Sequence, residues 1–257
     1  MSTYVLDQGF PGERERLEAM ARSWDPGTLR LVTDCGIGPG QRCLEVGAGT
    51  GTVSRALAEL VGPDGQVVAL DRDVRFLDDQ PANVEVCQAD LMTDDLPRAA
   101  FDLVHARLLV AHLHPHRDAI ARLADAVAPG GWLLVEDVDW TFVDLTVPSA
   151  PVHSAMMVAL RRILGQGGFD ATYGRHLYTD MRSLGLTEVT AEYRGNQTPS
   201  SNQSWLAWQL LVTQFEEDMV DTGLLSRRQV EDWWALSRAG TGSVVSATMF
   251  AVRARRA

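Results

Sequence analysis

The stretch that decides the fold is Cys43-Leu44-Glu45-Val46-Gly47-Ala48-Gly49-Thr50-Gly51. Its first half continues an apolar run that starts at Arg42, of the kind that forms a buried parallel strand. Three glycines then stand at alternate positions, and apolar residues return at helical spacing from Thr52 onward. A strand, a glycine turn and a helix in this order bring backbone N–H groups and a helix N-terminus close to a ligand. The stretch therefore predicts a binding site at the end of the first strand.

The spacing of the glycines separates two classes of cofactor. A dinucleotide-binding turn follows the pattern Gly-x-Gly-x-x-Gly, and Thr52 or Ser54 stands where its third glycine would be. The pattern here is instead acidic-x-Gly-x-Gly-x-Gly, with Glu45 as the acid. It resembles motif I of the class I S-adenosylmethionine-dependent methyltransferases. The resemblance implies that this cofactor is held by the acid and by the turn, which contributes Gly47, Ala48, Gly49 and Gly51.

Composition and charge restrict the possible functions. The 257 residues are 46% hydrophobic, enough to bury the core of one large α/β domain over residues 1–257. A net charge of −11 disfavours a nucleic-acid partner, because the phosphates would repel the protein. All 23 basic residues are Arg, which excludes catalysis through a Schiff-base lysine. The 3 cysteines are too few for a disulfide framework.

The sequence also bears on location and partners. It contains no apolar run as long as a membrane span, and its N-terminus lacks the basic-then-apolar order of a signal peptide. We therefore expect a cytoplasmic protein with a small-molecule substrate, no membrane contact and no nucleic-acid partner. The oligomeric state is left open, a homodimer included.

Residues 1–41 precede the first strand and are predicted to form a helical flap. Apolar residues at helical spacing predict helices over 14–24 and 28–35, with Asp25-Pro26-Gly27 separating them. Such a segment can pack on the sheet, or it can close over the cofactor as a lid. In the second case Tyr4 would contact the cofactor. The sequence does not decide between the two.

Two later strands are predicted to end in acids at the same edge of the sheet. The run 66–70 is followed by Asp71, about 20 residues past the glycines, where nucleotide-binding folds place a carboxylate on the ribose hydroxyls. The run 84–89 is followed by Asp90, which would reach the adenine amine. The neighbours Arg72 and Leu91 are expected beside the same ligand.

Strands and helices alternate from residue 42 to 140, which predicts a doubly wound parallel sheet. A fourth strand is predicted over 101–106, a helix over 118–128 and a fifth strand over 132–135. The triplet Ala89-Asp90-Leu91 and the Pro129-Gly130-Gly131 turn occur in the order and spacing of the methyltransferase family. Together with the glycine turn they resemble its small-molecule branch, akin to the enzymes of quinone biosynthesis and of bacterial natural products.

This resemblance implies a seven-stranded, mostly parallel sheet of order 3-2-1-4-5-7-6, with residues 188–194 and 248–253 as strands six and seven. The last strand would be antiparallel. Ala106 and Arg107, after the fourth strand, would lie beside the cofactor. Residues 141–257 would supply the last strands and the cap insertions of the acceptor pocket, whose Met and Trp residues suit a planar or apolar substrate.

Methyl transfer from a sulfonium is an in-line displacement that requires alignment of acceptor, methyl and sulfur, and exclusion of water. A base is needed only where the acceptor carries a proton. His112 is the first candidate and His105 the second, because both lie near the end of the fourth strand and imidazole suits proton transfer near neutral pH. Asp137, after the fifth strand, could orient a substrate hydroxyl or amine.

The leading hypothesis is a methyltransferase that acts on oxygen or carbon of a small metabolite. The main alternative is an enzyme of the same fold that keeps the cofactor but catalyses a cyclisation or another non-transfer step. A nonenzymatic cofactor-binding protein and a nicotinamide oxidoreductase are disfavoured, the first by the intact acids and glycines, the second by the glycine spacing. A metal site at His112, His114 and His116 is disfavoured because Pro115 interrupts the series.

Overall fold

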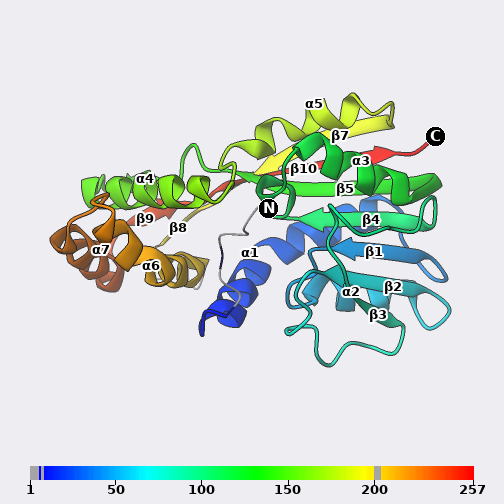
Figure 1. Cartoon of the computed structure of the whole chain (residues 1–257), viewed down its shortest axis with the longest axis horizontal. Helices are drawn as coiled ribbons and strands as arrows, with labels where there is room; N and C mark the ends of the chain where they lie inside the picture. The colour runs from blue at the N-terminus through cyan, green and yellow to red at the C-terminus, as the bar shows by residue number, and fades with distance from the viewer. Residues whose placement is uncertain (1–5, 7–8, 200–203) are drawn as a thin grey trace.

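The chain is built around a large twisted sheet. A computed structural model describes residue 6 and residues 9–199 and 204–257. Its seven-stranded sheet has the order β3-β2-β1-β4-β5-β10-β7 (Figure 1). The strands are β1 (Arg42–Val46), β2 (Gln66–Asp71), β3 (Val84–Gln88), β4 (Phe101–Arg107), β5 (Val127–Asp139), β7 (Thr187–Arg194) and β10 (Thr248–Arg255). β10 runs antiparallel to β5 and β7. The predicted order 3-2-1-4-5-7-6 is confirmed, with β7 and β10 as its sixth and seventh strands.

The first strand, β1, lies in the interior of the sheet between β2 and β4, as its nearly continuous apolar run requires. Val46 at its end is paired with Leu70 of β2 on one side and with Ala106 of β4 on the other. The chain adds β2 and β3 on one side of β1 and then crosses to place β4 on the other. The space between β1 and β4 is therefore the topological switch point, where such sheets bind ligands at the carboxyl ends of their strands.

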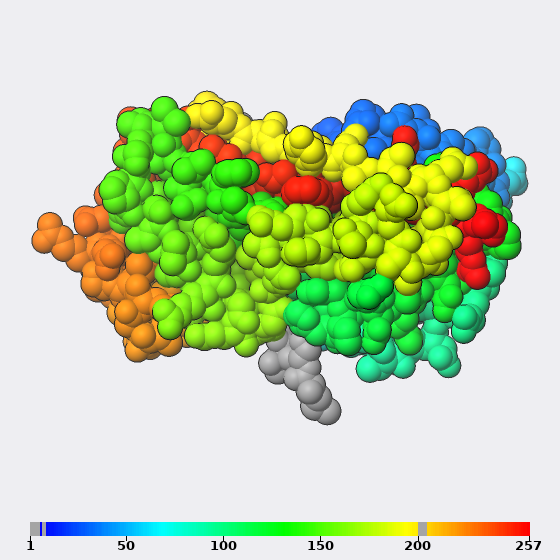
Figure 2. All heavy atoms as spheres, turned by 90° about the horizontal axis from the view of Figure 1, so that it is seen from above, coloured from blue at the N-terminus to red at the C-terminus, as the bar shows by residue number. Residues whose placement is uncertain are grey.

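Helices cover the sheet and extend the molecule at one end. They are α1 (Glu13–Asp34), α2 (Thr52–Val61), α3 (His116–Ala126), α4 (Pro151–Gln166), α5 (Leu177–Arg182), α6 (Ser204–Asp221) and α7 (Arg227–Ala239), with the 3-10 turns η1 (Val110–His112) and η2 (Tyr173–Arg175). Figure 1 shows α4, α6 and α7 gathered beyond one end of the sheet, and Figure 2 shows α7 (orange) beside α4 (yellow-green) at the same end.

A second, small sheet connects these three helices to the large one. It has the order β6-β9-β8, and its strands are β6 (Thr146–Val147), β8 (Gln197–Pro199) and β9 (Ser243–Val245). The sequence does not predict it, because its strands are only two or three residues long. These strands follow β5 and β7 and precede β10, so they extend the large sheet toward the helices. We call α4, α6, α7 and this small sheet the cap.

The N-terminal segment differs from its prediction. The sequence predicts a break at Asp25-Pro26-Gly27, whereas α1 is unbroken and contains Pro26. The prediction is wrong because contacts from the sheet hold this part of the helix. Arg107 donates hydrogen bonds to Asp25 at 2.6 Å and to Thr28 at 2.8 Å. A proline inside a helix costs about 3 kcal/mol, and these contacts offset that cost.

The fifth strand is longer than predicted. It begins at Val127 and includes the Pro129-Gly130-Gly131 segment, which the sequence places in a turn. The amide of Gly130 donates to the carbonyl of Arg256 at 2.8 Å, so the C-terminal end of the chain supports this part of the strand. Such a contact between distant parts of the chain has no local sequence signal.

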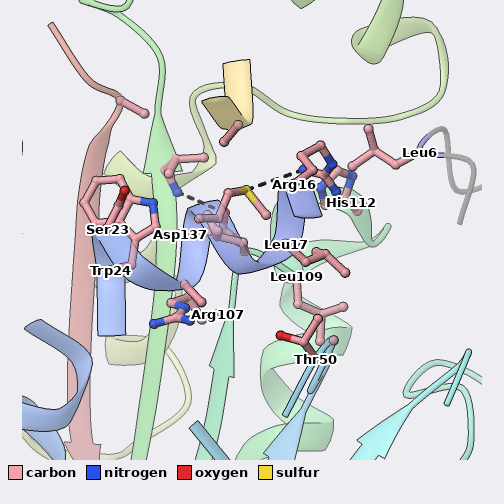
Figure 3. Close-up of a pocket in the computed structure, with 18 of the residues that line it drawn as sticks. Leu6, Arg16, Leu17, Ser23, Trp24, Thr50, Arg107, Leu109, His112 and Asp137 are labelled. Carbon is pink, nitrogen blue, oxygen red and sulfur yellow. Dashed lines mark hydrogen bonds between the residues drawn. The ribbon is translucent and has the colours of Figure 1, made fainter. Parts of the chain in front are cut away.

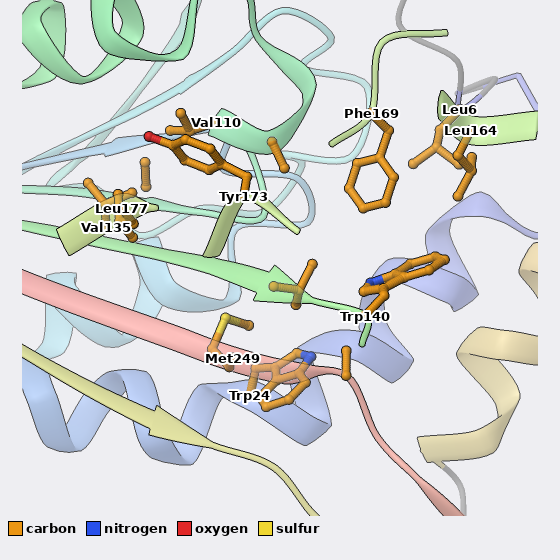
Figure 4. Packing of buried hydrophobic residues seen from close by; sticks show 14 of the residues in the cluster. Leu6, Trp24, Val110, Val135, Trp140, Leu164, Phe169, Tyr173, Leu177 and Met249 are labelled. Carbon is orange, nitrogen blue, oxygen red and sulfur yellow. The ribbon is translucent and has the colours of Figure 1, made fainter. Parts of the chain in front are cut away.

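One buried apolar cluster connects the sheet to the cap. It contains Val135 and Met249 from the sheet, Trp24 from α1 and Leu164 from α4 (Figure 4). Trp233 of α7 belongs to the same cluster and is fully buried. Because these side chains share one cluster, the cap helices pack against the sheet rather than around a core of their own. This packing fixes the cap over the carboxyl edge of the strands.

Candidate active site

A cavity of about 580 Å³ lies at the carboxyl edge of the sheet. The ends of four adjacent strands contribute Val46, Leu70, Arg107 and Asp137 to its floor. α1, α6 and the small sheet contribute to its walls, and Figure 3 shows α1 crossing it. The cavity lies where the sequence predicts a binding site, directly after the first strand.

The glycine turn forms one end of the cavity. The amides of Gly47 and Ala48 donate to the carbonyl of Leu70 at 2.8 and 3.2 Å, and the amide of Gly49 donates to Asp71 at 2.8 Å. The sequence predicts turn amides that face a ligand, whereas these three are bonded to protein acceptors. The difference arises because β2 lies beside the turn and supplies the acceptors. Because these amides are already bonded, the turn offers a ligand close contact with its backbone rather than free N–H donors. Such a surface suits a ligand group that carries no phosphates.

Gly47 and Gly51 are required by the shape of the turn. Both have positive φ, 76° and 70°, a region in which a side chain is strained. A Cβ on Gly47 would lie 3.3 Å from Leu109, and one on Gly51 would lie 2.9 Å from Leu77. Gly51 does not line the cavity; it is the N-cap residue that directly precedes α2. Its contribution to binding is therefore to shape the turn.

Two of the predicted acids line this end of the cavity beside the turn. Glu45 is buried and accepts a hydrogen bond from the Ser54 hydroxyl. Asp71 accepts from Gly49 with one oxygen and from the amide of Asp73 with the other, at 3.0 Å. Burial raises the pKa of Glu45 and that of Asp71 above the usual values for these groups. Because burial disfavours their negative charge, a cationic ligand at this end would be stabilised.

Other predicted cofactor residues differ in how they meet the cavity. Asp90 and Leu91 both line it, and Asp90 accepts a hydrogen bond from the amide of Met92 at 2.8 Å. Arg72 lines it from an exposed position. Ala106 is fully buried inside β4 and does not reach the cavity, so the prediction that it lies beside the ligand is wrong. Its side chain points into the core because strand residues alternate between faces.

Arg107 lines the cavity, but its charge is directed to α1. Its guanidinium binds Asp25 and Thr28, and the Thr28 hydroxyl lies 2.5 Å from a Glu136 carboxylate oxygen. The residue thus joins the floor of the cavity to its wall. A ligand can contact the part of Arg107 that faces the cavity, while the guanidinium stays paired with Asp25.

His105 does not face the cavity. Its side chain is 0% exposed, and its Nε2 lies 3.4 Å from Glu136. Its Nδ1 has no hydrogen-bond partner and lies 3.9 Å from Glu45. The prediction that His105 meets the substrate is wrong because strand alternation places it on the face covered by α1. Burial alone would raise the pKa of Glu136, but His105, Arg194 and Arg107 outweigh it and hold that pKa at about 2.

His112 does line the cavity. It ends η1, is half-buried, and its ring centroid lies 4.7 Å from that of Phe169. Burial, with the nearby charges of Arg16 and His114, lowers its pKa to about 3. The imidazole is therefore neutral near pH 7, but it is a much weaker base than a free histidine.

Asp137 forms part of the floor of the cavity. Its carboxylate is fully buried and accepts hydrogen bonds from the amides of Ala111 at 2.8 Å and Val138 at 2.9 Å. Burial raises its pKa to about 7. Since Ala111 belongs to η1, the carboxyl group holds the turn that carries His112. This arrangement adds a positioning role for Asp137. Because Asp137 also lines the cavity, its contact with a substrate stays a prediction.

Three other expectations concern a metal site, Tyr4 and membrane spans. His114 and His116 have ring centroids 4.3 Å apart, and among the described residues no three His, Cys, Asp or Glu side chains are grouped to hold a metal ion. Tyr4 lies outside the described residues. No helix in the described part of the chain has the length and hydropathy needed to span a bilayer.

Comparison with known proteins identifies the family. A family model described as a methyltransferase domain matches residues 16–257, which include most of α1, the sheet and the cap. The chain belongs to this methyltransferase family. The sheet order of the chain and the position of its cavity agree with that membership.

Individual relatives match the chain over part of their length. Methyltransferase str2 of Strobilurus tenacellus is 32% identical over 166 residues, 64% of this chain and 60% of that protein. The ubiquinone/menaquinone biosynthesis C-methyltransferase UbiE of Ectopseudomonas mendocina (strain ymp) is 36% identical over 124 residues, 44% of this chain and 47% of that protein. The chain thus covers less than two thirds of the length of either relative.

A solved structure shares the fold. Phosphoethanolamine N-methyltransferase 2 of Haemonchus contortus, in complex with phosphomonomethylethanolamine and S-adenosylhomocysteine, has a TM-score of 0.61 to this chain. The match covers 98% of this chain and 59% of that one, at 17% identity. At this identity the likeness establishes the fold alone.

The wall formed by α1 contains a charged pair, Glu13 and Arg16, that is not among the predicted site residues. Glu13 and Arg16 are both buried, and Arg16 donates to the two carboxylate oxygens at 2.7 and 2.6 Å. The available signal was their spacing: positions 13 and 16 share a helix face with Leu17 and Met20, which line the same cavity. A charged pair within an apolar stripe indicates a buried pair rather than a solvated face.

An aromatic row forms another wall of the cavity. Ring centroids are 5.1 Å apart between Phe169 and Trp140 and 4.8 Å apart between Trp140 and Trp208. The sequence predicts aromatic and Met side chains around the acceptor, and Trp208 agrees with this. Met156 and Met157 of α4 do not, because they are buried in the core. We call Phe169, Trp140 and Trp208 the aromatic row.

Proposed function

We propose that this protein is an S-adenosylmethionine-dependent methyltransferase that methylates oxygen or carbon of a small, largely apolar metabolite. The observation that carries the proposal is one cavity that joins the acids and glycine turn at one end to the aromatic row at the other. Transfer between two ligands needs both in one enclosed space, aligned and shielded from water. A site for the cofactor alone would not need the aromatic end.

The residues at the turn fit this cofactor. Carboxylates accept hydrogen bonds from ammonium groups and vicinal hydroxyls, so Glu45, Asp71 and Asp90 would hold its polar groups. Its positive charge would relieve the unfavourable burial of negative charge at Glu45 and Asp71. The turn at Gly47–Gly49 would admit its methionine part at close range. When bound, the cofactor supplies an electrophilic methyl group on a sulfonium.

The rest of the cavity would align the acceptor and exclude water. The aromatic row offers flat apolar surface to a planar substrate, and α1 and α6 cover the space from outside the sheet. Alignment alone can supply several of the roughly 7–11 kcal/mol that intramolecular reactions gain. We propose His112 as a wall residue that hydrogen-bonds the acceptor, since its lowered pKa makes proton abstraction unfavourable.

The names of relatives support the acceptor class. UbiE is a C-methyltransferase of ubiquinone and menaquinone biosynthesis, which supports transfer to carbon of a ring-containing metabolite. We further propose that the N-terminal half of α1 acts as a lid over the cofactor, because Arg16, Leu17 and Met20 line the cavity. The C-terminal half of the helix would stay in place, since Leu31 and Val32 are buried against the sheet.

The test is incubation of the full chain with S-adenosylmethionine that carries a deuterated methyl group, together with a panel of naphthols, hydroxyquinones and alkylated phenols. We expect mass spectrometry to show S-adenosylhomocysteine and an acceptor that has gained the labelled methyl. A converted substrate with the methyl donor unconsumed would instead establish the alternative, a cyclisation or other non-transfer step. No product together with no binding of either form of the cofactor would reject the proposal.

A further inference from the structure

The cavity wall contains a buried ion pair between Arg16 and Glu13. Four arginines line the cavity in the described part of the chain, and Arg22 and Arg72 among them are exposed. Arg107 is directed to Asp25. Arg16 is only 3% exposed, so its guanidinium is the one held away from bulk solvent. A charge in such a place acts on nearby ligands with little screening.

The neighbours of Arg16 hold it in one orientation. Its Nε and Nη2 bind the two oxygens of Glu13, one turn earlier on α1, at 2.7 and 2.6 Å. Its Nη1 lies 3.4 Å from the sulfur of Met20, the dashed line in Figure 3. Since Met20 also lines the cavity, this side of the guanidinium faces toward it. A sulfur is a weak acceptor, which an anionic oxygen could replace.

Arg16 lies at one end of the aromatic row. Figure 3 shows it beside His112, whose ring is 4.7 Å from Phe169, the first member of the row. The positive charge of Arg16 is one of the causes that lower the pKa of His112, so its field reaches this end of the cavity. The cavity thus has acids at the cofactor end and, at the end of the aromatic wall, a guanidinium that is paired with Glu13.

We propose that Arg16 determines specificity for acceptors that carry an anionic oxygen on a planar apolar body, either a phenolate or enolate or a carboxylate. This inference rests on the proposed function. The ring would lie along the aromatic row, and the charged oxygen would face Arg16 and His112. Among the residues that the structure describes, the other titratable groups that line the cavity near this position are Glu13 on α1, His112 on η1 and Asp137 in the floor. Glu13 is bound to Arg16 on the side away from Met20.

For transfer to that oxygen, the electrons and charges balance without a protein base. The acceptor loses its proton to solvent before or during binding, because the cation favours the anionic form. The oxygen lone pair then forms the new O–C bond while the S–C bond breaks and its electron pair returns to sulfur. One negative and one positive charge disappear together. No oxidant, reductant or further reactant is needed.

The test compares anionic and neutral probes in the presence of S-adenosylhomocysteine. One pair is 4-nitrophenol and 4-nitroanisole, measured above the pKa of free 4-nitrophenol, and the other is 2-naphthoate and its methyl ester. In the wild type we expect at least one anion to bind about tenfold or more tightly than its neutral partner, the range of a charge-assisted hydrogen bond. Arg16→Met should remove this preference, and Arg16→Lys should restore most of it.

Two further variants keep the result interpretable. Arg14→Met is the matched control, since Arg14 is exposed on the same helix, pairs with Asp78 and does not line the cavity. It should leave the preference unchanged. The double variant Glu13→Gln/Arg16→Met removes both charges and covers the case in which the single variant, with Glu13 buried alone, fails to fold. It too should bind anion and neutral partner equally.

The outcomes separate this inference from the proposed function. Wild-type protein that does not bind S-adenosylhomocysteine would contradict the proposed function itself. If the cofactor product binds, the inference is overturned by a wild type with no preference for either anion, by failure of both anions to bind, or by a preference that persists without Arg16. A preference confined to the phenolate pair or to the carboxylate pair supports the inference and identifies the source of the anionic oxygen.

Discussion

Asp71 at the end of β2 accepts a hydrogen bond from the amide of Gly49, at 2.8 Å, and so braces the glycine turn. The sequence predicts this aspartate as the acceptor for two ribose hydroxyls. The structure adds that the same carboxylate fixes the turn on which the methionine part would rest. One side chain therefore links both halves of the proposed cofactor site.

Loss of the Asp71 carboxylate is expected to weaken cofactor binding. Asp71→Ala should reduce the affinity for S-adenosylhomocysteine by about 1–3 kcal/mol, because it leaves hydroxyls and the Gly49 amide without their acceptor. Asp73→Ala is the control, since Asp73 pairs with Arg75 at 2.7 Å and does not line the cavity. Calorimetry on both folded variants measures the difference. Equal affinities of the two variants for S-adenosylhomocysteine would mean that Asp71 does not bind the cofactor.

His112 is expected to contribute little as a base. Moving a proton from a phenol of pKa about 10 to a group of pKa about 3 costs roughly 9–10 kcal/mol. We therefore expect His112→Ala to lower kcat by less than about tenfold, with the shape of the pH profile between about 5.5 and 9 unchanged. A loss of about 10²–10⁴-fold with an altered profile would restore the histidine as the base.

The ion pair between Asp25 and Arg107 is expected to hold α1 on the sheet. Its side chains are 22% and 13% exposed, so a double-mutant cycle of Asp25→Asn and Arg107→Met should show a coupling of about 1–3 kcal/mol in urea unfolding. The exposed pair of Arg98 and Asp125, at 2.8 Å, is the control and should couple by less than about 1 kcal/mol. Similar couplings in the two cycles would mean that the pair does not secure the helix.

The stability of the protein should depend on pH through Asp137. Its pKa rises from 3.8 to about 7 on folding, so below pH 3.8 the group is protonated in both states and has no effect. As pH rises toward 7, the unfolded state ionises first and stability falls by about 1.4 kcal/mol per pH unit. Asp137→Asn should remove this slope in urea unfolding, whereas Asn at exposed Asp118 should keep it. Parallel profiles for wild type and Asp137→Asn would contradict the assignment.

Much of the fold could be predicted because it depends on local signals. Apolar runs ending in Glu45, Asp71 and Asp90 mark strands, and right-handed crossovers leave few ways to order them. Residues at strand ends must lie at the sheet edge, which is why these acids line the cavity as predicted. The same reasoning predicts that Leu91 and Arg72 lie beside the ligand, and both residues line the cavity.

The remaining features depend on which surfaces pack together, and this has no local signal. His105 lies near the correct edge, but its burial follows from α1 covering that face of β4. Pro26 predicts a helix break until Arg107 is placed beside it. The apolar stripe around Arg16 indicates that it is buried, but only the path of α1 over the cavity shows what it faces. In the first two cases a contact between distant segments overrides the local preference.

The central claim is that the cavity binds S-adenosylmethionine and its demethylated product. The most direct measurement is a calorimetric titration of S-adenosylhomocysteine, and separately of NADH, into the full chain. The account predicts saturable binding of S-adenosylhomocysteine at one site, weakened in Asp71→Ala, and no binding of NADH. Binding of NADH without binding of S-adenosylhomocysteine would contradict it.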